Sequence, residues 1–311
     1  MSNGLPPLSF QPVVFVGNNI DCVENAPIEV IRKHFFRRAT ESEAVEIRKF
    51  LSRRSWPGDD SIYFERKAGA NTRAASEVDH RYYVIHRERS QEVDLYNGIE
   101  HDELEAASRL TDFELILRLV LMGPGCWGIA SRDEHLRICE RSSLLEAEPR
   151  KITKSDLELI GRTARKIKEC STKGVAVTKA VSLFHRLGDI DRGHSLYALG
   201  TFAVLESVLA HNPRGGYDSL THQLSAKMTL LNKRFEFPLD YSLFQLTEQK
   251  VWKLLYAFRS SIAHGSEPNF KSDLRHLKDF QSVVRFMDEA VKKVLQLGLE
   301  DPSFLQDLQS C

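Results

Sequence analysis

The pattern of apolar and polar positions divides the chain into two halves of different character. In residues 1–150, short apolar runs alternate with turn signals, a pattern typical of mixed α/β structure. The run Val13 to Val16 ends at Gly17-Asn18-Asn19 and is therefore predicted to be a strand. Other aromatic or β-branched runs give three more predicted strands, at Ser61 to Phe64, Arg81 to Ile85 and Trp127 to Ile129.

Two helices are predicted in this first half. Thr40 and Glu43 form a capping box, and the apolar residues that follow share one helical face as far as Leu51. A second apolar face with helical spacing runs from about Asp102 to Leu119.

From about residue 150 the apolar spacing is helical almost throughout. A further capping box, Ser155 to Glu158, opens this part. Glycine and proline breaks then separate helices expected at residues 155–172, 175–187, 193–211, 217–233, 243–264 and 272–297. With 146–150 as the linker, the sequence predicts an α+β protein: a mixed α/β domain at 1–150 and an all-α helical bundle at 151–311.

Composition narrows the class of protein. The 42% apolar residues are typical of a globular chain. Acidic and basic residues balance overall, but residues 1–150 carry a net −5 and residues 151–311 a net +5. This asymmetry permits a polyanionic partner for the second half without requiring one.

Location is predicted from what the sequence lacks. We find no apolar run long enough to span a bilayer and no signal-peptide pattern at the N-terminus. The five cysteines are scattered and odd in number. We therefore expect a cytoplasmic protein with reduced thiols, no membrane partner and no cysteine-bound zinc.

Most motifs that carry chemistry are missing. There is no H-E-x-x-H sequence, no Walker lysine and no G-x-S-x-G elbow. Asp189, Asp191 and His194 fall in one predicted loop, which we interpret as a solvated turn capping the next helix. We therefore expect no metal and no cofactor.

One segment remains, where a predicted helix ends with Arg259, His264 and then Gly265. Glycine just after a helix favours the left-handed conformation that closes it. A histidine in the last turn lies at the negative end of the helix dipole, which favours its protonated form. Such a histidine can donate a proton to a leaving oxygen, and an arginine can hold a phosphate.

A purely structural interpretation of this segment is also open. Arginine and histidine are favoured in a last helical turn whether or not they carry a function. Five residues on a helix correspond to about 140° of rotation, so Arg259 and His264 share a face only if the helix end unwinds or a second subunit contributes. Glu206 is a further candidate, either paired with Arg259 as a structural strut or lying at the edge of an apolar face.

The second half resembles the HEPN superfamily, specifically its ApeA-like branch, from Ser155 to Arg285. The matching pieces are Ala198 to Glu206, Tyr217 to Lys227 and Leu255 to Gly265. The last of these is similar to the branch's Tyr-x-x-Arg-Ser-x-Ile-x-His-Gly pattern.

The resemblance implies a homodimeric helical bundle in which the Arg–His helices of two subunits form one composite site. It also implies a metal-independent endoribonuclease of a defence or toxin system, with an antitoxin or defence protein as a possible further partner. On this mapping Arg259 steadies the phosphate of the RNA, and His264 is the general acid or base for attack by the 2′-hydroxyl. Residues 1–150 would then sense a signal or regulate the site.

Ser260 departs from the family pattern. Nuclease members commonly carry Asn, Asp or His directly after the arginine, whereas serine supplies no charge. The alternative function is therefore a non-catalytic HEPN-type module that binds RNA or another protein.

Overall fold

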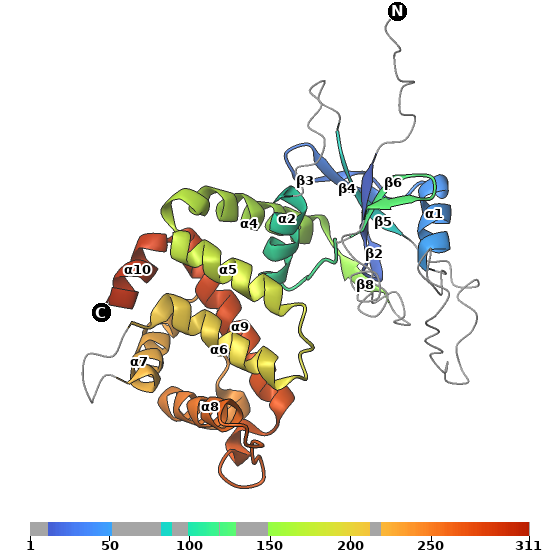
Figure 1. The fold of residues 1–311 in the computed structure, drawn as a ribbon. Coiled ribbons are helices and arrows are strands. Elements are labelled where there is room, and N and C mark those ends of the chain that lie inside the picture. Colours follow the sequence, from blue (N-terminus) through green and yellow to red (C-terminus); the bar gives the residue numbers. More distant parts are fainter. Residues whose placement is uncertain are drawn as a thin grey trace, which may run out of the picture. The chain divides into compact units, whose positions relative to one another are not determined.

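The computed structural model describes residues 12–51, 82–88, 99–117, 119–128, 149–211 and 219–310. The chain divides into two compact units, Met1–Ala164 and Arg165–Cys311. The first contains a β-sheet with helices and the second is helical, so the predicted α+β class is confirmed (Figure 1). The dividing point lies inside helix α4, Lys154–Lys173, whereas the sequence placed it at residue 150.

The first unit is built on an antiparallel sheet in the order β3-β4-β5-β1-β6-β7. Strand β1 lies between two neighbours, and all four of its residues are buried, which explains its uninterrupted apolar sequence. The strands are β1 Val13–Val16, β3 Ile28–Ile31, β4 His34–Arg38, β5 Tyr83–Arg87, β6 Leu119–Gly123 and β7 Cys126–Gly128.

Three of the strands predicted from the sequence are confirmed as β1, β5 and β7. The fourth, Ser61 to Phe64, lies outside the described residues, as do most of the predicted linker 146–150 and the predicted break at 213–216.

Helix α1, Glu41–Leu51, packs on one face of this sheet. Ile47 and Phe50 meet Phe15 and other core residues of the strands. The predicted capping box is present: the Thr40 N–H donates to the Glu43 carboxylate at 2.7 Å, and the Glu43 N–H donates to the Thr40 hydroxyl at 3.4 Å.

The helix predicted from Asp102 to Leu119 is wrong at both ends. Helix α2 spans Ile99–Arg109, and Leu119 begins strand β6. Polar side chains hold the backbone in another conformation after α2, because the Ser108 hydroxyl accepts a hydrogen bond from the Leu115 N–H at 2.9 Å. Pairing of Leu119 with Phe15 then outweighs the helical spacing.

Helix α4 begins earlier than predicted, and its capping box is a different one. Thr153 and Asp156 exchange hydrogen bonds at 2.8 and 3.3 Å, so the helix starts at Lys154 and not after Ser155. Just before it, strand β8, Arg150–Ile152, pairs in parallel with β2, Ile20–Cys22. Gly161 then passes so close to the Val30 carbonyl oxygen that there is no room for a Cβ at this position.

Six further α-helices are described in the second unit (Figure 1). They are α5 Val175–Leu187, α6 Ser195–Leu209, α7 Leu220–Asn232, α8 Glu248–Ala263, α9 Phe280–Glu300 and α10 Pro302–Ser310, with short 3-10 turns at Ser242–Phe244 and Arg275–Leu277. The prediction for 272–297 began too early, because Asp279 caps α9 by accepting from the Ser282 N–H. Helix α10 was missed.

Helix α6 is the centre of the helical unit and contacts α5, α7, α8, α9 and α10. Its sequence is apolar on nearly all sides, as expected for a helix surrounded by others. Glu206, the one charged residue of α6, therefore projects from an otherwise apolar helix. None of the described helices is long and apolar enough to cross a membrane.

Candidate functional site

Helix α8 ends in a Schellman motif, as Gly265 led us to expect. Gly265 has φ +74° and donates its N–H to the Ile262 carbonyl at 2.9 Å. The Ser266 N–H donates to the Ser261 carbonyl, also at 2.9 Å. His264 is the C-cap residue, and its N–H still bonds to Ser260, so the helix does not unwind before His264.

Burial divides α8 into faces that keep Arg259 and His264 apart. The core side contains Val251, Leu255 and Phe258. Arg259 lies at the margin of that side, whereas His264 is exposed. The rotation of about 140° predicted for five helical residues is therefore retained, and within one chain the two residues lie on different faces.

Arg259 is paired with Glu206 across the α6–α8 contact. Its Nη2 donates to Glu206 Oε2 at 3.1 Å. Its Nε lies 2.9 Å from Oε1 without the alignment of a hydrogen bond. The two side chains are 32% and 17% exposed, so the pair is held at the edge of the helix packing and is not sealed in the core.

Tyr256 completes this cluster. Its hydroxyl donates to Glu206 Oε1 at 3.2 Å, and its ring meets Phe202 edge to face at 5.7 Å. Burial, and then the nearby Glu206 carboxylate, raise the pKa of Tyr256 well above its ordinary value. Tyr256 therefore remains a neutral donor to Glu206, and the carboxylate is held by one phenol and one guanidinium.

His264 and Ser260 lie away from this cluster. Both are exposed, and no hydrogen bond or ion pair joins the His264 imidazole to any other described residue. Of the predicted site residues, the structure thus brings Arg259 and Glu206 together, and it leaves His264 with Ser260 on the outward side of α8.

Sequence reasoning missed two lysines on the same side of α8 as His264. Lys250 and Lys253 are exposed and, by helical rotation, project from the same side of α8 as Ser260 and His264. Residues three or four apart share one side of a helix, and this spacing links Lys250 and Lys253 to Ser260 and His264. In the sequence analysis the same spacing was applied only to the apolar face of the helix.

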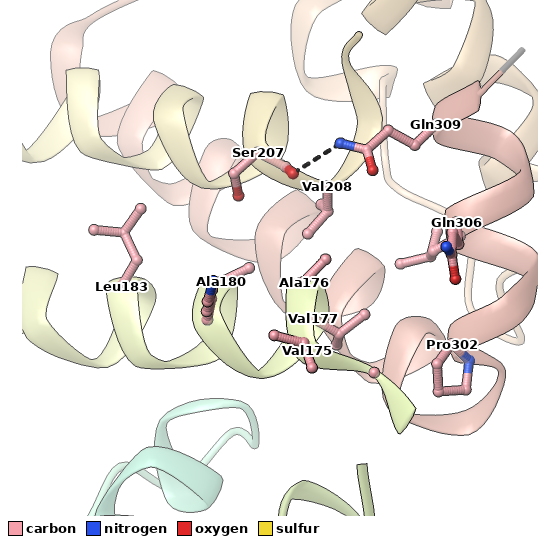
Figure 2. A pocket seen from close by; sticks show the side chains of 13 residues that line it. Val175, Ala176, Val177, Ala180, Leu183, Ser207, Val208, Pro302, Gln306 and Gln309 are labelled. Carbon is pink, nitrogen blue, oxygen red and sulfur yellow. Dashed lines mark hydrogen bonds between the residues drawn. The ribbon is translucent and has the colours of Figure 1, made fainter. Parts of the chain in front are cut away.

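A separate groove lies between α5 and α6 and is closed at one end by α10 (Figure 2). It has a volume of about 580 Å³ and includes the exposed apolar side chains of Val175 and Leu183. Gln309 spans its edge by donating to the Ser207 carbonyl at 3.0 Å. None of the four predicted site residues lines this groove.

Over the described ranges, no group of three or more His, Cys, Asp or Glu side chains is placed to hold a metal ion. The predicted loop from Asp189 to His194 is a helix cap, as interpreted from the sequence. His194 is the N-cap residue of α6, and its Nδ1 accepts a hydrogen bond from the Leu196 N–H at 3.1 Å.

Comparison with known proteins gives no relative: no family model, no curated protein and no solved structure matches this chain.

Proposed function

We propose that the protein is a metal-independent endoribonuclease of HEPN type, acting in defence or as a toxin. The observation that carries the proposal is the exposed His264, whose imidazole has no hydrogen-bond partner among the described residues, at a Schellman-capped helix end on the same helix as the ion-paired Arg259. The resemblance of Leu255 to Gly265 to the HEPN pattern supplies the reaction class. Neither residue alone identifies that reaction.

The proposed reaction needs no cofactor. The 2′-oxygen of RNA attacks the adjacent phosphorus, and the bond from phosphorus to the 5′-oxygen breaks. A general base takes the 2′ proton, and a general acid protonates the departing 5′-oxygen, leaving a cyclic phosphate and a 5′-hydroxyl. His264 performs one of these proton transfers, and Arg259 stabilises the charge on the phosphate oxygens.

A dimer resolves the separation of the two residues. Because Arg259 and His264 lie on different faces of α8, one phosphate contacts both only when a second copy supplies one of them. Glu206 orients Arg259 through Nε and Nη2, which leaves Nη1 to meet the phosphate.

The test is cleavage of RNA by purified protein in EDTA, with the ends analysed by mass spectrometry. The wild type should leave 2′,3′-cyclic phosphate ends. His264→Ala should lower the rate by at least about a hundredfold, the usual range for a general acid or base, with an unchanged melting temperature. Ser266→Ala is the matched control on the same exposed helix end. Cleavage at the wild-type rate by the His264→Ala variant would contradict the proposal.

The second candidate is a non-catalytic HEPN-type module that binds RNA or another protein. The observation favouring it is the Arg259–Glu206 ion pair, because a guanidinium already matched by a carboxylate offers less net charge to a phosphate. In that case Arg259 is a strut between α6 and α8. The same assay separates the two candidates, since a module gives no cyclic-phosphate ends at any protein concentration.

A further inference from the structure

We infer that the outward side of α8 binds the phosphate backbone of a single-stranded nucleic acid, with Lys250 and Lys253 as its contacts upstream of His264. This inference rests on the proposed function, because it takes RNA as the substrate that His264 meets. It adds the surface that holds the strand, which neither the HEPN pattern nor the Arg259–His264 pair specifies.

The charge on this side of α8 is of one sign. Lys250 and Lys253 are exposed, and neither forms an ion pair with another described residue. From Gln249 to Ser266 the chain contains no acidic residue. Two exposed lysines on one side of a helix, in a stretch without acidic residues, form a local positive surface that can contact phosphates.

The shape of the surface also suits a backbone. Between the lysines and His264, the outward residues are Ala257 and Ser260, whose short side chains leave the helix open to close approach. Lys253 and His264 are eleven residues apart, which corresponds to about 16 Å along a helix. A strand in contact with both therefore runs along α8 for more than one nucleotide.

The side chains on the outward side of α8 also indicate how far binding depends on the nucleotide sequence of the strand. Arg259 faces α6 and is already matched by Glu206, so the unmatched cations on α8 are the two lysines. Among the described residues on this outward side, His264 has the one aromatic ring, so the bases of a strand beside Lys250 and Lys253 have no stacking platform there. We therefore expect these contacts to weaken as salt rises and to depend little on the nucleotide sequence.

The test is fluorescence anisotropy of a labelled oligouridine whose 2′-hydroxyls are methylated, so that binding is measured without cleavage. The Lys250→Gln/Lys253→Gln variant should weaken binding about tenfold at low salt. It should also flatten the dependence of log K on log salt by about 1.4, or about 0.7 for each lost phosphate contact. The matched control is Lys168→Gln/Lys179→Gln, which loses the same charge from exposed positions on α4 and α5.

The outcomes separate this inference from the proposed function. Equal losses in the test and control variants, or no saturable binding by the wild type, overturn the inference. Suppose that RNA cleavage depends on His264, while the lysine variant cleaves and binds RNA normally. The proposed nuclease function is then supported, and the proposed binding surface on α8 is contradicted. If the lysines govern binding but no cleavage occurs, the surface stands and the second candidate function replaces the first.

Discussion

Glu206 shows how one charged residue can be accommodated in an apolar helix. A carboxylate among the buried side chains of α6 loses hydration and needs replacement donors. Tyr256 and Arg259 supply them from successive turns of α8. Glu206 therefore needs the guanidinium of Arg259 in place of the water that its carboxylate has lost. The same ion pair orients Arg259, whatever further role the arginine has.

This account predicts a measurable coupling between the two residues. Arg259→Met and Glu206→Gln should each destabilise the protein, and a double-mutant cycle by urea unfolding should give about 1–2 kcal/mol of favourable coupling. That range lies between the values for exposed and for buried ion pairs, because the pair is partly exposed.

Ser260→Ala, on the outward side of α8, should change stability by less than about 0.5 kcal/mol and serves as the control. A coupling energy near zero would show that Glu206 is solvated without Arg259.

At the scale of elements, the end of α8 depends on the left-handed conformation of one residue. Gly265 has φ +74°, and apart from its two chain neighbours no described residue has a heavy atom within 4 Å of the position a Cβ would take. A substitution there therefore tests backbone conformation without a packing clash.

Gly265→Ala should lower the free energy of unfolding by about 1 kcal/mol, the left-handed penalty less the gain from a stiffer unfolded chain. Gly265→Asn should cost less, since asparagine tolerates this conformation. Thermal unfolding of both variants measures the difference. Equal losses for alanine and asparagine would contradict the conformational explanation.

Elements with local signals were predictable, and those determined by distant pairing were not. Helix α5 lies at its predicted bounds, 175–187, because glycines flank it. The β3–β4 hairpin was missed because its turn uses Lys33 at φ +65°, a conformation that lysine does not signal. The Glu206–Arg259 pair was one of two sequence alternatives, since residues 53 apart cannot be placed together by periodicity.

At the scale of the whole molecule, the chain combines a β-sheet unit with a helical unit. One helix, α4, has residues in both units. Because the division falls inside α4, a shortened chain that begins at Arg165 would cut this helix. A chain that begins before Thr153 keeps its capping box. The assays of RNA binding and cleavage are therefore best made on the full chain.

The proposed composite site makes a prediction about mixed subunits. Arg259→Ala and His264→Ala should each be inactive alone. Mixed, unfolded and refolded together, they should recover part of the cleavage activity, because a heterodimer again combines one arginine with one histidine from opposite copies. Cleavage of the labelled RNA before and after mixing measures the recovery. Absence of any recovery would place the working residues within one chain.

The Schellman motif also limits what the backbone can offer to a ligand. The N–H groups of His264, Gly265 and Ser266 all point back to carbonyls of α8. None of these three amides is available to cradle an anion in the way that glycine-rich loops do. Any recognition at this helix end must come from side chains, and the imidazole of His264 is the group that the fold presents there.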